Sequence, residues 1–417
     1  MTMKTPVMKQ GKWRTARAVL LLVAVMAPGL SGCTMKAGGL FGSSDCTLMP
    51  GGIPDCGSGG GSGGQGGGPE KVRYLPVSGN PAFRDPKGIA VDSRGNVWVA
   101  NAGSDSVTEI FRKGGYRRKL TYMGRATHFD HPHDLAIDRF DNVWVVSRYG
   151  VTALYARDRY RRPAYYGQRG YPVHFRERFV AVDPYAPWPV SVWVTGSKRQ
   201  LLNIYGTPGK TKWDLTDIDK STFLTSRKTL EGVAVDDREN LFLANSGGTN
   251  IQIYLKRAGG GLPNVAWPST THGIGSKDDL PVLVALDGKG NVWNTTPSTH
   301  RVVENYVGDQ FRKQTAVFNT APTFQPYDPQ GIALDAKGTL WMADHANEQV
   351  AFLLVPLAKH HKTHAIILGK PGHPFHPRRI AIDDLGDIWL TGDEGVMMVR
   401  HTAAPVKTPL LGQPKSP

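Results

Sequence analysis

Short apolar runs, each followed by a tight turn and a second apolar run, recur along most of the sequence. In the first such unit, Gly88 to Val91 is apolar at consecutive positions, which is typical of a strand covered on both faces. Asp92 and Gly95 follow, and they favour a turn because Asp accepts backbone N–H bonds and Gly adopts positive φ. Val97 to Val99 forms the second run. The unit therefore predicts two strands joined by a turn.

The unit occurs seven times, with roughly 45 to 53 residues between equivalent positions. The Asp that opens the turn is found at Asp92, Asp138, Asp183, Asp236, Asp287, Asp335 and Asp383. The second run carries a large aromatic residue at Trp98, Trp144, Trp193, Phe242, Trp293, Trp341 and Trp389. Short strands and turns with this period are typical of propeller blades. We therefore predict an all-β fold, a seven-bladed β-propeller of four-stranded antiparallel blades.

The two ends of the repeat region are predicted to meet. The last repeat runs out near Arg400 with three obvious strands, whereas Lys71 to Leu75 precede the first repeat. We expect residues 71–75 to supply the missing outer strand, because this pairing removes two exposed sheet edges. The predicted propeller is then residues 71–401, closed by pairing of its N- and C-terminal strands. Residues 402–417 are rich in Pro and predicted to form a loose tail.

The N-terminus has the pattern of a secretory signal. A basic stretch is followed by the apolar run Ala18 to Ala27, which is long enough for only ~15 Å of helix. Leu30-Ser31-Gly32-Cys33 then resembles a bacterial lipobox, in which the Cys is lipidated; the alternative is an ordinary signal peptide with a chance Cys. We expect residues 1–32 to be the signal and Cys33 to anchor the exported protein to the cell envelope. Because Thr34 rather than Asp follows, the outer membrane is favoured over the inner.

Residues 33–70 are predicted to be a flexible tether, because residues 57–68 contain only Gly, Ser and Gln. Cys46 and Cys56 lie in this tether and are the remaining two of three cysteines. In an exported protein we expect them to form a disulfide, with two free thiols or a metal-binding pair as the alternatives.

The sequence has 50 Lys and Arg against 35 Asp and Glu, a formal net charge of +15. This excess favours membrane headgroups, an anionic glycan, a phosphate-bearing ligand or an envelope protein as partner, with general solubility as the alternative explanation. Nucleic acid is disfavoured because the protein is expected to be exported, and we expect a monomer. The segment Tyr160 to Tyr171 interleaves basic and aromatic residues, which suits binding of sugars or phosphates or, alternatively, an ordinary outer strand and loop.

The repeats resemble NHL repeats and the streptogramin lyase (virginiamycin B lyase)-like propellers. The resemblance rests on the pattern Pro-x-Gly-Ile-Ala-Val-Asp followed by Gly-Asn-Val-Trp-Val-Ala and covers about residues 71–400. It implies the fold. Propellers of this kind include binding modules, metal-dependent lactonases and lyases, so the resemblance alone does not choose a function.

Residues just before each first strand are expected to surround the mouth of a central channel. They include Lys87, His133, Glu231, Gln330 and Arg378. For Mg²⁺ or Ca²⁺ the candidate ligands are His133, Asp134 and Glu231, and for catalysis the candidates are His133 and Glu231. Lys87 and Arg378 oppose a bound cation, so we expect a cationic mouth that binds an anionic ligand. A binding or scaffold module at the envelope is favoured, and a metal-dependent lyase or gluconolactonase-like lactonase is the alternative.

A second candidate metal cluster lies before the second repeat. His128, His131 and His133 are close in sequence to Asp130 and Asp134. These residue types bind transition metals, but the same spacing is common in solvated loops. The solvated loop is the favoured interpretation.

Overall fold

The computed structural model divides the chain into two units, Met1–Gly67 and Gly68–Pro417. It describes residues 83–166, 179–184, 191–196, 201–206, 230–246, 251, 280–287, 291–304, 328–352, 365–368 and 374–417, and the backbone of the other strand residues named below. The first unit contains the antiparallel strand pair β1 (Thr47–Leu48) and β2 (Pro54–Asp55). Cys33, Cys46, Cys56 and the predicted signal peptide lie outside the described residues. No helix in the described part of the chain is long and apolar enough to cross a membrane.

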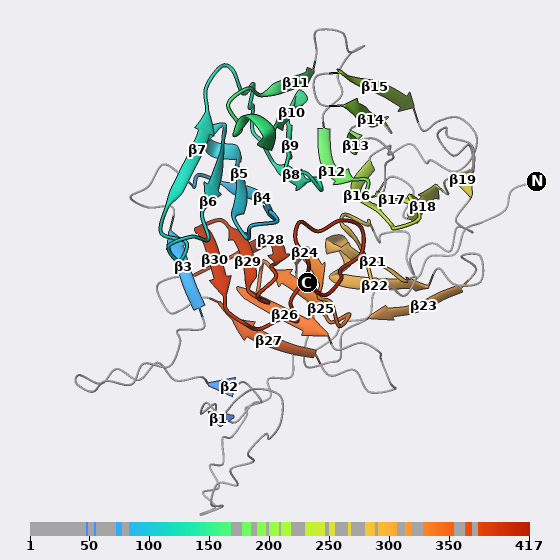
Figure 1. The fold of residues 1–417 in the computed structure, drawn as a ribbon. Coiled ribbons are helices and arrows are strands. Elements are labelled where there is room, and N and C mark those ends of the chain that lie inside the picture. Colours follow the sequence, from blue (N-terminus) through green and yellow to red (C-terminus); the bar gives the residue numbers. More distant parts are fainter. Residues whose placement is uncertain are drawn as a thin grey trace, which may run out of the picture. The chain divides into compact units, whose positions relative to one another are not determined.

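Residues 68–417 form antiparallel four-stranded sheets that stand around a common centre (Figure 1). The first sheet comprises β4 (Pro86–Val91), β5 (Val97–Asn101), β6 (Ser106–Ile110) and β7 (Lys119–Met123). The second comprises β8 (Asp134–Ile137), β9 (Val143–Ser147), β10 (Gly150–Leu154) and β11 (Ala164–Gly167). The third comprises β12 (Glu177–Val182), β13 (Val190–Gly196), β14 (Gln200–Thr207) and β15 (Lys210–Asp217). The fourth comprises β16 (Leu230–Val235), β17 (Leu241–Asn245), β18 (Asn250–Tyr254) and β19 (Ala266–Trp267).

The remaining sheets follow the same order. The fifth comprises β20 (Val284–Leu286), β21 (Asn291–Thr296), β22 (Arg301–Tyr306) and β23 (Lys313–Phe318). The sixth comprises β24 (Pro329–Leu334), β25 (Leu340–Asp344), β26 (Gln349–Leu353) and β27 (Thr363–Ile367). The seventh comprises β28 (Pro377–Ile382), β29 (Ile388–Gly392), β30 (Gly395–Val399) and β3 (Val72–Pro76). The short 3₁₀ helices are η1 (Ala102–Ser104), η2 (Ala156–Asp158) and η3 (Pro297–Thr299).

The outer strand of the seventh sheet comes from the other end of the chain. β3 pairs antiparallel with β30, with Val72 opposite Val399 and Pro76 opposite Gly395. This is the pairing that the orphan segment before the first repeat suggested. It joins residues that are more than three hundred positions apart in the sequence.

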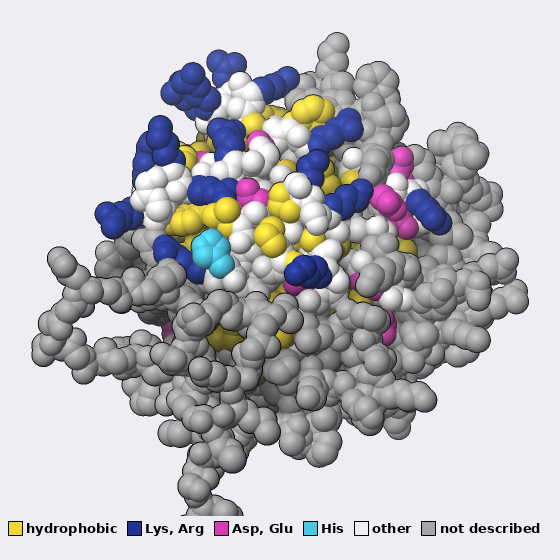
Figure 2. All heavy atoms as spheres, turned by 60° about the horizontal axis from the view of Figure 1, so that its bottom comes forward, with side chains coloured by type: hydrophobic (Ala, Val, Ile, Leu, Met, Phe, Trp, Pro, Cys, Tyr) yellow, Lys and Arg dark blue, Asp and Glu magenta, His cyan; other side chains and the backbone are white. Residues whose placement is uncertain are grey.

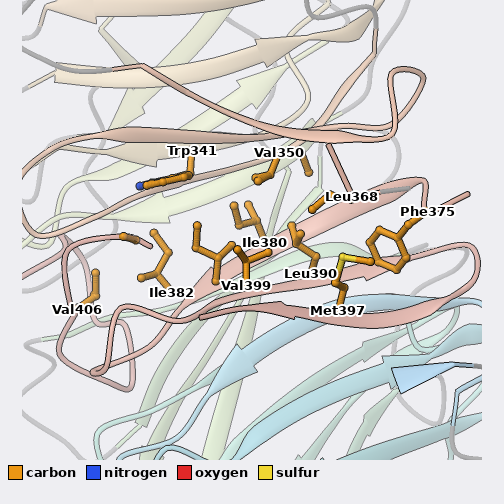
Figure 3. Close-up of a cluster of buried hydrophobic side chains, with 13 residues drawn as sticks. Trp341, Val350, Leu368, Phe375, Ile380, Ile382, Leu390, Met397, Val399 and Val406 are labelled. Atoms are coloured by element: carbon orange, nitrogen blue, oxygen red, sulfur yellow. The ribbon is translucent and has the colours of Figure 1, made fainter. Parts of the chain in front are cut away.

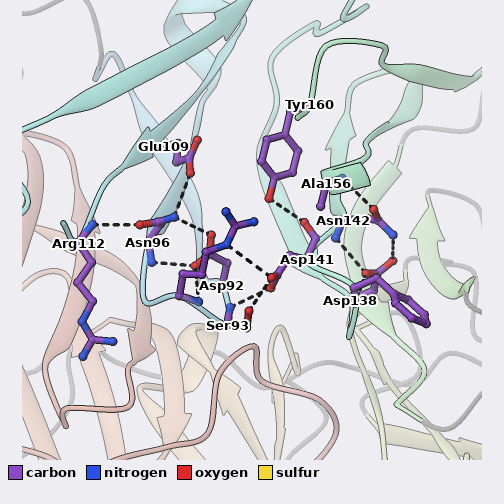
Figure 4. Close-up of polar contacts among 12 residues, drawn as sticks. Asp92, Ser93, Asn96, Glu109, Arg112, Asp138, Asp141, Asn142, Ala156 and Tyr160 are labelled. Atoms are coloured by element: carbon purple, nitrogen blue, oxygen red, sulfur yellow. Dashed lines mark hydrogen bonds and ion pairs between the residues drawn. The ribbon is translucent and has the colours of Figure 1, made fainter. Parts of the chain in front are cut away.

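The repeated Asp holds the turn through several side-chain hydrogen bonds in six of the repeats, and Figure 4 shows Asp92 and Asp138. Asp92 Oδ1 accepts from the backbone N–H of Arg94 at 2.9 Å and of Asn96 at 2.8 Å. Its Oδ2 accepts from Trp98 Nε1 at 3.2 Å, so the two most regular residues of the repeat bond each other. Because the strands alternate in direction, these turns and the connections between third and fourth strands lie at one end of the propeller, the turn end. The first strands begin at the opposite end, the mouth end.

The core lies between neighbouring sheets. Figure 3 shows the contact of the sixth and seventh sheets, where Trp341 and Val350 face Ile382, Leu390 and Met397. The aromatic residue of the second strand fills this space, and Trp98, Trp144, Trp293 and Trp389 are fully buried. A sheet that packs on both faces needs apolar residues at consecutive positions, which explains the unbroken apolar runs of the sequence.

The C-terminal tail is packed, so the prediction of a loose tail is wrong. Val406 is 2% exposed and its N–H donates to the backbone O of Asp383 at 3.0 Å. Ala404 N donates to Asp335 Oδ2 at 3.0 Å, and Gly412 lies against the backbone of Val235. The tail therefore crosses the turn end from the seventh sheet toward the fourth, and Figure 1 places the C-terminus near the centre of the sheets. Small apolar residues and backbone hydrogen bonds hold it there, and a high Pro content does not exclude this.

Candidate functional site

The first strands of the sheets enclose a cavity of about 140 Å³ at the centre of the propeller. Its wall includes residues from all seven sheets, among them Ile89, Asp134, Phe179, Val233, Val284, Ile332 and Arg379. Asp134 and Arg379 are charged, and the other residues of this wall are apolar or Gly. The cavity thus carries one acid and one base among apolar side chains and glycine.

Asp134 and Arg379 occupy the repeat position four residues before the turn Asp. The equivalent residue is Gly88 in the sheet before that of Asp134, and Gly331 in the sheet before that of Arg379. A Cβ atom at Gly88 would lie 2.7 Å from Asp134 Cα, and one at Gly331 would lie 2.6 Å from the backbone O of Arg378. The glycines therefore allow neighbouring first strands to approach closely. The non-glycine residue on the adjacent strand provides the side chain that lines the channel.

Asp134 is the first residue of β8, and its Oδ2 accepts a hydrogen bond from Val180 N at 2.9 Å. Burial raises the pKa of the Asp134 carboxyl to about 6, although the Arg379 charge and the Val180 N–H act in the opposite direction. The group therefore changes charge slightly below neutral pH. When protonated, it is a hydrogen-bond donor inside the cavity.

Arg379 lies on β28 and is held by two neighbours. Its Nη1 donates to the backbone O of Gln330 at 2.5 Å, and its guanidinium carbon lies 5.0 Å from the centroid of the Phe179 ring. Burial lowers the pKa of Arg379, while the charges of Asp134 and Glu231 raise it. Arg remains protonated in proteins. No ion pair within 4.0 Å joins the described side chains of Arg379 and Asp134, so the two charges affect each other without direct contact.

The predicted rim residues lie at the mouth end, but their charges have partners there. Lys87 Nζ lies 2.7 Å from Asp85 Oδ1, and Arg378 Nε donates to Asp393 Oδ1 at 2.5 Å. Gln330 Nε2 donates to an oxygen of Asp328 at 2.8 Å. The expected cationic mouth is therefore largely neutralised. The carboxylates responsible lie outside the repeat position that was used to predict the rim.

The structure does not bring the predicted catalytic and metal candidates to one point. His133 Nδ1 lies 3.1 Å from the backbone O of His131, and the backbone O of Glu231 accepts from Thr195 Oγ1 at 2.7 Å. Of the predicted set His133, Asp134 and Glu231, only Asp134 is in the described wall of the cavity. Mg²⁺ and Ca²⁺ require six or more oxygen ligands, and Arg379 on the same wall opposes a cation. The described residues of the cavity do not fit a divalent cation.

One group of potential metal ligands in the described part of the chain is Asp105, Asp130 and His131. It lies at the mouth end between the first two sheets and includes two members of the histidine cluster predicted from the sequence. His131 Nδ1 lies 2.7 Å from Asp130 Oδ1, and His131 N donates to Asp105 Oδ1 at 2.8 Å. The side chains are exposed, and internal hydrogen bonds already satisfy them in part.

A second charged cluster, between the sixth and seventh sheets, was not predicted. His345 Nε2 lies 3.2 Å from Asp393 Oδ2, and His345 Nδ1 lies 3.5 Å from Asp328 Oδ2. The His376 ring, 5.3 Å from that of His345, bonds Glu394, and this bond raises the pKa of His376. These residues follow second strands or precede first strands, so they come together only when neighbouring sheets pack.

Sequence reasoning also missed Arg379 and Phe179 as cavity residues. The signal was present, because the position four before the turn Asp is Gly in three repeats and a larger residue in the others. At this position the backbone of a neighbouring strand lies close to a Gly in three repeats. A larger side chain at the same position has to project into the central cavity.

No protein-family model matches the sequence, and no curated protein matches it. Among solved structures, a catalytically inactive virginiamycin B lyase from Staphylococcus aureus with quinupristin is 13% identical, with a TM-score of 0.59 over 79% of this chain and 99% of that chain. YCF48 from Cyanidioschyzon merolae is 12% identical, with a TM-score of 0.55 over 80% of this chain and 99% of that chain.

Extracellular domains are also similar in structure. The extracellular domain of a putative one-component system from B. thetaiotaomicron is 14% identical, with a TM-score of 0.53 over 80% of this chain and 40% of that chain. At these identities the likeness concerns the fold alone. Residues 68–417 therefore have a β-propeller fold similar to that of the streptogramin lyases.

Proposed function

We propose that this chain is an exported, membrane-tethered propeller lipoprotein that binds a small carboxylate-bearing molecule in its central cavity. The observation that carries the proposal is a single base, Arg379, on the wall of a cavity of about 140 Å³ whose other lining residues, apart from Asp134, are apolar or Gly. A cavity of about 150 Å³ accommodates a benzene-sized group. Arg379 uses one N–H donor on Gln330, and the rest of its planar fork suits a carboxylate.

Asp134 makes the proposed binding depend on pH. Its ionised carboxylate repels an anion, whereas its protonated form donates a hydrogen bond to one. Because the pKa of Asp134 is about 6, affinity for a carboxylate is expected to fall as the pH rises through that value. A neutral ligand of the same shape is expected to show a weaker dependence.

The test is a calorimetric titration with benzoate, with benzamide as the uncharged probe. Arg379→Gln is expected to weaken benzoate binding by about 10- to 100-fold, because it removes a charge-assisted hydrogen bond. Arg378→Gln is the matched control, since the adjacent Arg378 bonds Asp393 on the rim and is expected to leave affinity unchanged. Equal losses in both variants, or no benzoate binding by the parent, would reject the proposed site.

The proposal includes seven blades closed by strands from both ends of the chain. Seven repeats and the pairing of β3 with β30 support it. Deleting residues 70–78 is expected to lower the free energy of unfolding by several kcal/mol, because it exposes the edge of β30. An unchanged melting temperature would reject closure by this strand.

The lipid anchor is supported by Leu30 to Cys33, and export is also in keeping with the extracellular neighbours. Cys33→Ala is expected to release the protein from the membrane fraction, and retention after a high-salt wash would contradict the anchor. The disulfide between Cys46 and Cys56 remains a prediction. The antiparallel pairing of Thr47 with Asp55, which adjoin the two cysteines in sequence, supports it.

The alternative function, a metal-dependent lyase or lactonase, is favoured only by the likeness in fold to virginiamycin B lyase. A calorimetric titration with Mg²⁺ and Ca²⁺ separates the two functions. Stoichiometric uptake at micromolar concentration that disappears in Glu231→Ala would favour the enzyme. We expect no such uptake.

A further inference from the structure

We propose that the turn end of the propeller, over its first two sheets, docks on an anionic phospholipid bilayer. The proposal goes beyond ligand binding in the cavity. It rests on the proposed lipid anchor only for the orientation of the protein on the membrane.

Basic side chains are concentrated at this end. The loop between β6 and β7 and the loop between β10 and β11 both lie there, as Arg112 N bonding to Asn96 and Ala156 N bonding to Asn142 demonstrate. The exposed cations of these loops and of the adjoining turns are Arg94, Lys113, Arg117, Arg118, Arg139, Arg157, Arg159, Arg161 and Arg162. Figure 2 shows Lys and Arg side chains gathered over the side of the molecule where these two sheets lie.

Few carboxylates at the turn end are available to neutralise these cations. Asp92 and Asp138 are buried and bond the turn backbone and a Trp. Asp141 accepts from Ser93, and Asp384 pairs with Arg112. No ion pair with a described carboxylate is made by Lys113, Arg117, Arg118, Arg159, Arg161 or Arg162. These six cations therefore have no described carboxylate that competes with an external anion.

Exposed large apolar side chains also lie at the turn end. Phe140 is 48% exposed, Leu385 is 42% exposed and Leu410 is 54% exposed. Phe140 and Leu385 lie in turns of the second and seventh sheets, and Leu410 lies in the tail that crosses the same end. A basic surface with exposed large apolar residues has the two attractions that hold peripheral proteins on an anionic bilayer, headgroup charge and apolar insertion. A soluble polyanion would use only the first.

The path of the chain supports the same orientation. β3 is antiparallel to β30, and its first residue, Val72, is opposite Val399, immediately before the turn end. β3 therefore begins at the turn end. A tether that arrives from a lipid at Cys33 would bring this end toward the membrane.

The mouth end has the opposite character. Asp85, Asp105, Asp130, Asp328, Glu348, Asp393 and Glu394 lie at or near it. Two of its cations, Lys87 and Arg378, are paired with two of these carboxylates, and Arg148 lies 4.0 Å from Asp130. With Arg84 and Arg125, the cations named at this end are five against seven carboxylates. An anionic bilayer therefore has no comparable attraction for this end, and docking by the turn end leaves the mouth of the cavity facing away from the membrane.

The test is co-sedimentation of the full chain carrying Cys33→Ala, which lacks the lipidation site, with phospholipid vesicles. We expect binding to vesicles of phosphatidylglycerol with phosphatidylcholine, and much weaker binding to phosphatidylcholine alone. Replacing Arg117, Arg161 and Arg162 together by Gln is expected to weaken binding on the order of 100-fold, because each basic residue near the surface contributes about five-fold.

The matched control replaces Arg84, Arg125 and Arg148 by Gln, which removes the same charge from the mouth end. It is expected to bind the vesicles as the parent does, and circular dichroism checks that both triple variants fold. Equal weakening by the two triple variants, or no vesicle binding by the parent, would overturn the inference. Binding to heparin but not to vesicles would also overturn it in favour of an acidic glycan. The lipid anchor itself is tested by fractionation of Cys33→Ala, so the two proposals fail separately.

Discussion

The two ends of the propeller differ in where their acidic side chains lie. At the mouth end, acids and bases lie on the surface and pair with each other, as Lys87 does with Asp85 and Arg378 with Asp393. At the turn end the acids are largely buried, where they bond backbone N–H groups and Trp side chains, and the bases remain outside. The two ends therefore differ in surface charge because their acids have different structural roles. The repeated Asp serves the fold, and the basic surface is a consequence of its burial.

The largest effect is expected from removing a turn carboxylate. Asp138 is 1% exposed and accepts from Phe140 N, Asn142 N, Asn142 Nδ2 and Trp144 Nε1. Asp138→Ala leaves these buried donors without their acceptor, so we expect a loss of about 3–5 kcal/mol in the free energy of unfolding, measured with urea. Asp138→Asn keeps one acceptor oxygen and should lose less. A loss below about 1 kcal/mol for Asp138→Ala would break the contrast between the two ends.

A smaller effect is expected from removing the tail that covers the turn end. A chain that stops after Thr402 loses the buried Val406 and Ala403, and it exposes the turns that they cover. We expect the free energy of unfolding to fall by about 2–4 kcal/mol, from lost apolar burial and backbone hydrogen bonds. Removing only the exposed Ser416 and Pro417 is the control and should change nothing. An unchanged melting temperature for the longer truncation would instead support the prediction that the tail is loose.

A buried acid near the turn end makes stability depend on pH. Glu109 is 3% exposed, and burial raises its pKa to about 7, although Tyr122 donates a hydrogen bond to it. The folded state therefore holds this proton at a pH where the unfolded chain has released it. Stability is highest below the ordinary pKa of 4.5 and falls as the pH rises toward 7. Glu109→Gln is expected to remove about 2 kcal/mol of this fall between about pH 5 and pH 7.5. The same slope in both proteins would contradict the assignment.

The smallest effect is expected at the mouth end. Asp393 bonds Arg378 and lies near His345, but its side chain is 39% exposed. Asp393→Asn is therefore expected to change the free energy of unfolding by less than about 1 kcal/mol, as is usual for surface pairs. Urea unfolding of Asp393→Asn and Asp138→Asn, measured side by side, compares the loss of one carboxylate charge at each end. Equal losses would show that exposure does not distinguish the two ends.

The strands were predictable because the residues that determine each strand and turn lie close together in the sequence. The apolar run, the Asp turn and the aromatic residue of the second run lie within about a dozen positions, and the bond from Trp98 to Asp92 joins residues only six apart. The cavity was less accessible to sequence reasoning. It depends on which side chain replaces Gly next to a neighbouring strand, whereas the rim prediction rests on the position one residue before that of Arg379.

The location of charge was the least predictable property. Arg378 and Asp393 are fifteen residues apart, and Arg112 pairs with Asp384 on another sheet, so only packing decides which charges cancel. The tail was mispredicted for a similar reason. Its anchors, Ala403 and Val406, are single small apolar residues among prolines and have no periodicity of their own.

The pairing of β3 with β30 has a consequence for how the protein is made. A ribosome or a secretion channel delivers residue 72 first and residue 399 among the last, so the seventh sheet stays incomplete until nearly the whole chain has emerged. Contacts this distant in sequence form slowly, because a long loop must close before the pairing stabilises anything. Until then the chain lacks the pairing of β3 with β30. Completion of the seventh sheet is thus timed by the arrival of β30.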